Sequence, residues 1–378
     1  MKIYIDGTIY SLQKGGGITR YTNELINGFI NLGHEVTLII HPKTFNQEIK
    51  NKKLKTIEID SILRIDNKLL RLFTYPFHKL KLEKYFKEHN IKDGIFHSTY
   101  FVHYKNLKIP QILTIHDLTR EKFPIYFNRV NDKLFLMLTK NAILKSNAII
   151  CDSKQTADDL CTYYKTPVDK TNVAYLGVNQ IFNKKTQIEK DSFISFKNLP
   201  KQYLLFVGRR STYKNFENFI MAYSKWEHKS KFPLIIVGGG KLTEEELDLI
   251  KKLKLENNIT SFDFAREEEL VMFYNCAHCF IFPSLSEGFG LPLLESMACG
   301  TTVLASDIPV FKEIAKDVPY YFNPYNQESI IKALDDSIIK NDSKINAGLE
   351  MVKKFTWENT VKETLAIYQK ILNQNSFL

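Results

Sequence analysis

The chain lacks a hydrophobic run long enough to cross a bilayer, because none approaches the roughly 20 apolar residues that a membrane-spanning helix needs. The apolar run after Met1 is too short for a signal peptide, so we expect a cytoplasmic protein whose membrane contact is at most peripheral. The five cysteines are too few, and odd in number, for a disulfide framework. No excess of Gly or Pro suggests a fibrous chain.

Two of the cysteines, Cys276 and Cys279, have the Cys-x-x-Cys spacing of a metal or redox site. No second pair completes a zinc tetrahedron, and the segment runs into an expected buried strand. Free cysteine is among the most buried residue types, so we interpret both as structural.

At 378 residues the chain exceeds what one hydrophobic core usually holds, which predicts two domains. The net charge of +10 is unevenly distributed. Residues 1–190 carry 30 Lys/Arg and 18 Asp/Glu, a net +12, whereas residues 191–378 carry 22 and 24, a net −2. The basic half suits an anionic partner or surface, either nucleic acid or a lipid membrane. No nucleic-acid-binding module is recognisable, so we expect no nucleic acid partner.

The first half alternates apolar, β-branched runs with helical patterns, which predicts a parallel sheet covered on both faces. Strands are expected at residues 2–6, 36–40, 111–115 and 148–151. The glycine run Gly15-Gly16-Gly17 follows the first strand, and a helix is expected over residues 18–32, closed by Gly33. The order of strand, glycine loop and helix suits phosphate binding.

A second series of strands is expected at residues 203–208, 234–237, 279–282 and 302–305. Residues 183–200 lose periodicity and are rich in lysine, which predicts a linker. The chain then divides into Rossmann-like domains at residues 1–182 and 201–355, with a final helix at 356–378. Ligands collect at the carboxyl ends of parallel strands, so we expect the active site in a cleft between the two α/β sheets.

The strongest local signal is the segment at residues 282–300, where a strand runs into a glycine turn and then a helix with Pro292 in its first turn. Free main-chain amides at that helix start, with Gly288 and Gly290 allowing close approach, can hold a phosphate. Glu295 lies about one turn into the helix, where a carboxylate can accept hydrogen bonds from both ribose hydroxyls. Glu287 precedes the turn.

The Glu-x7-Glu pattern of Glu287 and Glu295 resembles the signature of retaining glycosyltransferase family 4, whose members have the GT-B fold. Residues 206–216 resemble the same family's Gly-Arg…Lys-Gly segment for the donor phosphates, with Asn215 where Gly is commoner. The resemblance implies a nucleotide-sugar donor, a diphosphate held by Arg209 or Arg210 with Lys214, and an acceptor that is a saccharide or is lipid-linked.

The resemblance also assigns roles to residues outside these motifs. It implies that Glu287 grips the transferred sugar, that His116 touches the donor sugar, and that Gly16 and Gly17 let the first loop approach the substrates. Asp117 is expected to be a neighbour of His116 or its orienter. The resemblance also implies further residues that bind the nucleotide. These are Phe264 and Ala265 at the base, and Phe289 and Leu291 in the glycine turn.

Such families use no divalent metal, and Asp-x-Asp, which would hold one, is absent here, so we expect metal-independent transfer without a cofactor. The segment at residues 206–216, with Asn215 in place of Gly, looks like those of bacterial cell-surface polysaccharide transferases, some of which are mannosyltransferases. This likeness favours GDP-mannose as the first candidate donor and a UDP-sugar as the second. A sugar-nucleotide epimerase and a non-catalytic sugar-nucleotide-binding protein remain alternatives. A nicotinamide dehydrogenase fits poorly, because Arg20 stands at the third glycine position and the next strand ends in His41.

Residues 68–85 are basic and aromatic, and they fit either a surface that rests on anionic lipid or an ordinary solvated helix face. Pro76 is expected to interrupt the helical run there.

Overall fold

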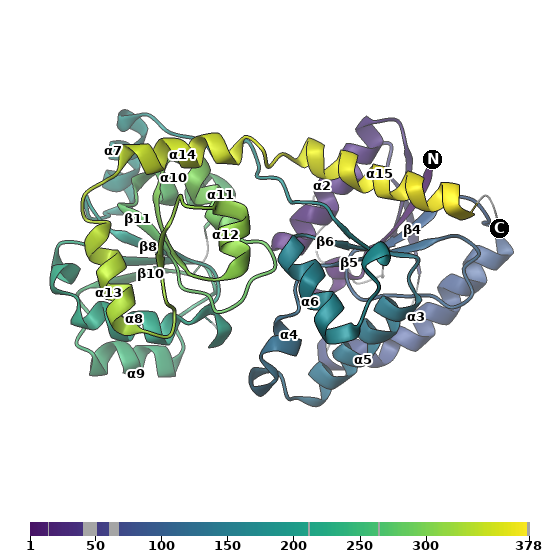
Figure 1. The fold of residues 1–378 in the computed structure, drawn as a ribbon, viewed down its shortest axis with the longest axis horizontal. Helices are drawn as coiled ribbons and strands as arrows, with labels where there is room; N and C mark the ends of the chain where they lie inside the picture. Colours follow the sequence, from purple (N-terminus) through teal and green to yellow (C-terminus); the bar gives the residue numbers. More distant parts are fainter. Residues whose placement is uncertain (14, 41–50, 60–67, 211, 264, 376–378) are drawn as a thin grey trace. The chain divides into compact units, whose positions relative to one another are not determined.

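The structure, a computed structural model, describes residues 1–378 apart from 14, 41–50, 60–67, 211, 264 and 376–378, and apart from the side chains of 68–77 and 375. It divides into two compact units, shown in Figure 1. Unit 1 comprises Met1–Gly177 and Trp357–Leu378, and unit 2 comprises Val178–Thr356. The predicted pair of Rossmann-like α/β domains is confirmed.

Unit 1 contains a parallel sheet that has seven strands among the described residues, in the order β3-β2-β1-β4-β5-β6-β7. The strands are β1 Lys2–Asp6, β2 Glu35–Ile40, β3 Lys55–Glu58, β4 Ile95–Ser98, β5 Gln111–Ile115, β6 Ala148–Cys151 and β7 Thr171–Val173. The helices are α1 Ile9–Leu12, α2 Gly17–Asn31, α3 Lys68–Glu88, α4 Thr119–Lys122, η1 Pro124–Tyr126, α5 Val130–Lys145, α6 Lys154–Tyr164, η2 Val168–Lys170 and α15 Trp357–Asn375.

Unit 2 repeats the plan with a parallel sheet of six described strands in the order β10-β9-β8-β11-β12-β13. The strands are β8 Leu204–Val207, β9 Leu234–Val237, β10 Ile259–Phe262, β11 Cys279–Phe282, β12 Thr302–Ser306 and β13 Tyr320–Phe322. The helices are α7 Gln187–Lys197, η3 Thr212–Lys214, α8 Phe216–Lys225, η4 Glu227–Ser230, α9 Glu244–Lys252, α10 Glu267–Cys276, α11 Leu291–Ala298, α12 Pro309–Ala315, α13 Gln327–Asp336 and α14 Asp342–Val352.

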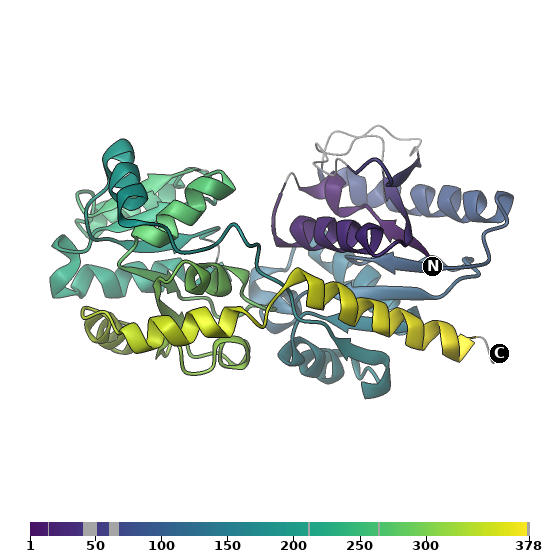
Figure 2. The same cartoon turned by 90° about the horizontal axis from the view of Figure 1, so that it is seen from above.

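The final helix, α15, completes unit 1 rather than unit 2. It lies along α2, as Figures 1 and 2 both show. The two helices come so close that a Cβ atom on Gly28 would lie 2.4 Å from the Val361 side chain. Unit 1 is therefore built from two separate stretches of the chain.

The predicted linker at residues 183–200 is wrong. Those residues form α7 within unit 2, and Thr186 and Glu189 cap its amino end reciprocally. Phe193 packs edge-on against Phe273, with ring centroids 5.1 Å apart, and Lys197 pairs with Glu269. Lys184 and Lys185 precede α7, and Lys190 and Lys197 lie on it. The chain passes between the units at Gly177 and Thr356 instead.

The interruption predicted at Pro76 is also wrong, because α3 runs unbroken from Lys68 to Glu88. A helix can continue through proline when it gives up one main-chain hydrogen bond and bends. In the described part of the chain, no helix is both long enough and apolar enough to cross a membrane.

Candidate active site

The predicted donor-binding residues gather at the carboxyl ends of neighbouring strands in unit 2. Gly208 follows β8, Gly238 follows β9 and Pro283 follows β11. The sheet order β10-β9-β8-β11 makes these strands neighbours, and parallel strands end at the same edge. Segments far apart in the sequence are therefore brought to one edge, as the sequence predicts.

The glycine turn before α11 has the geometry that a phosphate-binding helix start requires. Gly290 is the residue before the helix, with φ of 102°, a left-handed value that favours glycine. A Cβ atom there would also lie 3.0 Å from the Phe311 ring. Pro292 occupies the first turn, and partly exposed Leu291 begins the helix. Because Gly290 has no side chain, a ligand can approach the main chain of this turn closely.

Phe289 lies in the same turn but points into the core. It is buried, and its ring packs against Phe355 with centroids 5.8 Å apart. Gly288 beside it is also buried. A part for Phe289 in ligand binding would therefore be through its main chain.

The two glutamates of the motif have different surroundings. Glu295 is buried on α11 and accepts a hydrogen bond from the Tyr274 hydroxyl at 3.3 Å. Glu287 is partly exposed and forms an ion pair with Lys214, whose Nζ lies 2.6 Å from its Oε1. The main-chain hydrogen bond from Leu285 to Tyr213, at 2.8 Å, ties the two motif segments together beside that pair.

Asn215, where the family pattern has Gly, is compatible with the same main-chain conformation. Its φ of 57° and ψ of 28° lie in the left-handed region, which Asn tolerates better than most residues. Its side-chain amide donates to the Pro324 carbonyl at 2.7 Å. This departure from the pattern therefore leaves the Lys214 segment in place.

The two adjacent arginines, Arg209 and Arg210, are used differently. Arg210 is almost entirely buried and pairs with Glu246 at 2.9 Å. It also donates to the carbonyls of Gly238, Gly240 and Lys241 at 2.8 to 3.0 Å. Arg209 is exposed. Arg210 is therefore committed to protein groups, and Arg209 is the better placed of the two to meet a ligand.

The glycine run held by Arg210 escaped the sequence analysis. Gly238, Gly239 and Gly240 all have φ near +80°. A Cβ atom on Gly239 would lie 2.5 Å from the Gly208 carbonyl oxygen, so this loop packs directly on the segment that follows β8. Three successive glycines after an expected strand were the signal that could have identified it.

The residues expected at the nucleotide base are described only in part. Phe264 lies outside the described residues. Ala265 is partly buried between β10 and α10. The Asp263 carbonyl accepts a hydrogen bond from the Gly240 amide at 3.2 Å, which joins this segment to the glycine run.

In unit 1, Gly16 and Gly17 lie exposed at the amino end of α2, and Gly16 has φ of 141°. Four residues further on, the Tyr21 ring meets the His116 ring edge-on, with centroids 5.1 Å apart. The glycine loop and His116 thus belong to one region of unit 1.

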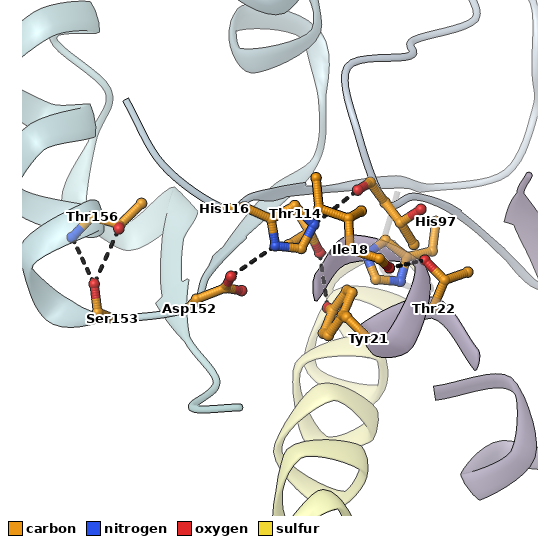
Figure 3. A network of polar contacts seen from close by, with 10 residues as sticks. Ile18, Tyr21, Thr22, His97, Thr114, His116, Asp152, Ser153 and Thr156 are labelled. Carbon is orange, nitrogen blue, oxygen red and sulfur yellow. Dashed lines mark hydrogen bonds and ion pairs between the residues drawn. The ribbon is translucent and has the colours of Figure 1, made fainter. Parts of the chain in front are cut away.

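His116 directly follows β5 and is oriented by Asp152 rather than by Asp117. Its Nδ1 lies 2.7 Å from the Asp152 carboxylate and its Nε2 donates to the Thr99 carbonyl at 3.0 Å (Figure 3). Of the two expectations for Asp117, that of orienter is wrong, because its exposed side chain accepts from the Thr119 amide. Asp152 directly follows a strand predicted from the sequence, a position that could have revealed it.

These contacts favour a charged imidazole at His116. Burial alone would lower the pKa of His116, but the Asp152 carboxylate and the Thr99 carbonyl together raise it above its usual value. Burial raises the pKa of Asp152, and His116 offsets part of that rise. With a carboxylate on one side and a carbonyl on the other, both ring nitrogens act as donors.

A buried polar chain runs behind His116. The Tyr21 hydroxyl lies 3.0 Å from Thr114 Oγ1, which in turn lies 2.7 Å from His97 Nε2 (Figure 3). Tyr368 on α15 reaches the other nitrogen of His97. The last helix of the chain therefore contributes to the surroundings of His116.

Comparisons with known proteins match both halves of the chain to glycosyltransferase families. Residues 187–351 match the family described as "Glycosyl transferases group 1", and residues 15–180 match "Glycosyltransferase Family 4". The O-antigen chain mannosyltransferase RfbU of Salmonella typhimurium is 30% identical over 222 residues. That match spans 58% of this chain and 58% of RfbU, less than two thirds of its length.

Solved structures share the fold. Sucrose-phosphate synthase from Thermosynechococcus elongatus matches with a TM-score of 0.81 and 19% identity over 99% of both chains. HepE of Anabaena, in complex with UDP and glucose, matches with a TM-score of 0.73 and 15% identity over the whole of both chains. At these identities the likeness is one of fold, that of the GT-B glycosyltransferases. With a family match along each of its two halves, the chain belongs to the family 4 glycosyltransferases.

Proposed function

We propose that this glycosyltransferase moves a hexose from a nucleotide sugar to a saccharide or lipid-linked acceptor in surface polysaccharide synthesis, with retention and without a metal. GDP-mannose is the first candidate donor and a UDP-sugar the second. RfbU, a mannosyltransferase by name, supports the first. The observation that carries the proposal is the ion pair of Lys214 with Glu287 beside the amino end of α11.

The leaving group is a nucleoside diphosphate, whose negative charge grows as the sugar departs. The main-chain amides at the start of α11 and the positive end of its dipole offer one anion site. Arg209 and Lys214 add positive charge from the segment after β8. Fixed amides and two cations can stabilise this charge without a divalent ion.

The ion pair suggests how the free enzyme prepares for its donor. Without donor, Lys214 neutralises Glu287 across 2.6 Å. A diphosphate, with more negative charge than one carboxylate, would compete for the ammonium group. Once Lys214 turns to the phosphates, the Glu287 carboxylate is released toward the sugar, where it can stabilise a positively charged transition state.

Glu295 would hold the ribose. Its carboxylate is buried on α11 and accepts a hydrogen bond from Tyr274. A carboxylate has about four acceptor sites, so it can also accept from two vicinal hydroxyls.

His116 is assigned to the donor sugar and not to a general base. A histidine that donates from both nitrogens has no lone pair with which to take the acceptor's proton. Its positive charge would favour the departing diphosphate instead.

Two experiments test the proposal. In a thermal-shift panel of GDP, UDP and ADP, the correct nucleotide at 100 times its dissociation constant should add about 2.7 kcal/mol of stability. Anomeric assignment of the product by NMR should show retention, with chelator leaving the rate unchanged. An inverted product, or activity lost to chelator and restored by Mg²⁺, would overturn the mechanism.

A product formed from the nucleotide sugar without acceptor would favour the epimerase alternative. Nucleotide binding with neither transfer nor epimerisation would favour a binding protein. These outcomes separate the three functions with one set of reactions.

A further inference from the structure

One face of α5 exposes apolar and basic side chains in alternation. Val130, Lys133, Met137, Lys140 and Leu144 all lie on the surface, spaced by three or four residues along the helix. The apolar members are 74%, 60% and 58% exposed. This spacing places the five side chains, which we call the α5 stripe, on one side of the helix.

The α5 stripe is not the side through which the helix packs on its own unit. Thr139, Ala142 and Ile143 are buried, and Phe135 and Leu138 pack against the core. The helix therefore already buries one face. Contiguous apolar surface beyond that face commonly marks an interaction site.

Apolar side chains are also exposed in η1, which precedes α5 in the sequence. Ile125 is 77% exposed and Tyr126 is 43% exposed. Arg129 lies exposed between η1 and the α5 stripe. From Val130 to Leu144 the helix alone spans about 21 Å at 1.5 Å per residue.

The charge of this surface has one sign. The α5 stripe carries Lys133 and Lys140 and no carboxylate. Asp132, on the same helix, is mostly buried against Arg120, and Glu121 on α4 accepts from the Tyr164 hydroxyl. The acidic side chains of these elements are thus occupied on the inner side.

The charge of the whole unit has the same sign. Unit 1 holds 29 Lys/Arg and 19 Asp/Glu, a net +10, whereas unit 2 holds 23 of each. The entire net charge of the chain therefore belongs to the unit that carries the α5 stripe.

We propose that the α5 stripe and η1 rest on an anionic bilayer surface. A dry protein interface would have to desolvate two lysines that stand between apolar side chains. At a lipid surface, each lysine can instead bury its stem and extend its ammonium group to the phosphates, while Val130, Met137 and Ile125 enter the acyl boundary. The negative surface potential of anionic lipid attracts lysine side chains that lie near it. The inference rests on the proposed lipid-linked acceptor, because it would bring the enzyme to that substrate.

The full chain should co-sediment with vesicles of phosphatidylglycerol and phosphatidylcholine, and less as salt rises. V130E/M137E should reduce the partition coefficient at least tenfold, and K133A/K140A should reduce it at low salt. The matched control is V168E, because Val168 is 79% exposed and lies elsewhere in unit 1. This variant should bind vesicles as the unmodified protein does.

Equal binding by V130E/M137E and the unmodified protein, or binding by neither, would overturn the proposal. A self-association removed by V130E/M137E would also overturn it, in favour of a second copy as the occupant. The thermal shift with GDP or UDP should be the same in all variants. Vesicle binding without any nucleotide shift would refute the proposed function and leave the docking surface standing.

Discussion

The hydroxyl of Tyr368 on α15 lies 2.5 Å from Nδ1 of His97 on β4, although 271 positions separate the two residues. Burial lowers the pKa of His97 to about 3, so the ring is neutral. One nitrogen of a neutral ring donates and the other accepts. Because Thr114 occupies the second nitrogen, His97 has both ring nitrogens hydrogen-bonded only while α15 is in place.

Replacing Tyr368 with Phe should test this contact. Y368F leaves a buried nitrogen of His97 without its partner, which should lower the free energy of unfolding by about 1–3 kcal/mol. Trp357 belongs to unit 1 and Trp226 to unit 2, so urea unfolding followed by fluorescence in a W226F background reports unit 1 alone. Y163F, at a 46% exposed position, should change the value by less than about 0.5 kcal/mol. Equal effects of the two variants would contradict the argument.

The two arginines after β8 should have separable effects. R210A leaves Glu246 and the glycine-run carbonyls without their donor, so we expect a loss of about 3 kcal/mol in the stability of unit 2. R209A should leave stability within about 0.5 kcal/mol and weaken the nucleoside diphosphate about tenfold or more. Thermal unfolding and calorimetry measure the two quantities. A stable R210A, or an R209A that binds normally, would reverse the assignment.

The two glutamates of the motif, Glu287 and Glu295, should have different roles. E295Q should weaken the bare nucleoside diphosphate by roughly 1.5–3 kcal/mol, because a charge-assisted hydrogen bond to the ribose is lost. E287Q should keep that affinity, since Lys214 is then already released from its ion pair, but should lower kcat. Calorimetry and steady-state rates separate the roles, with exposed Glu256→Gln as the control. A Glu287 variant that binds as poorly as E295Q would refute the division.

Asp6 should make unit 1 less stable as pH rises. Burial raises its pKa from 3.8 to about 7, and the hydrogen bonds from Thr8 offset only part of that rise. Between these values the folded chain holds a proton that the unfolded chain has released, so stability falls with rising pH. Three pH units correspond to at most about 4 kcal/mol.

The variant D6N removes this titration. Its free energy of unfolding, relative to the unmodified protein, should rise between pH 4 and pH 8 by up to about 4 kcal/mol. Urea unfolding in the W226F background measures the difference, and exposed Asp169→Asn is the control. A difference that stays constant across this range would show that Asp6 does not hold its proton in the folded state.

Regular apolar patterns made much of the fold predictable, and the exceptions have physical reasons. The strand β11 is a continuous apolar run, and β1 and β5 are largely apolar, as is typical of sheets buried on both faces. The central strand β4 was missed because His97 and Ser98 interrupt its apolar run. The His97 ring bonds to Thr114, 17 positions away, so no local pattern shows this partner, whereas Ser98 accepts from the Val102 amide four residues further on.

The site was predictable where its residues are neighbours in the sequence. Glu287, Gly290 and Glu295 come from one strand, turn and helix. The different roles of Arg209 and Arg210 could not be predicted, because they depend on contacts of Arg210 with Glu246 and the glycine run, which are distant in sequence. The same holds for Asp152, which meets His116 only because β5 and β6 are neighbours in the sheet.

Because α15 completes unit 1, the two units become complete at different times during synthesis. As the chain leaves the ribosome from its amino end, every residue of unit 2 emerges before Trp357. Domains generally fold as units during synthesis, so unit 2 can fold while unit 1 still lacks its last helix. On the nascent chain, the side of α2 that contacts α15 and the His97 nitrogen that bonds to Tyr368 lack these partners until the final helix is released.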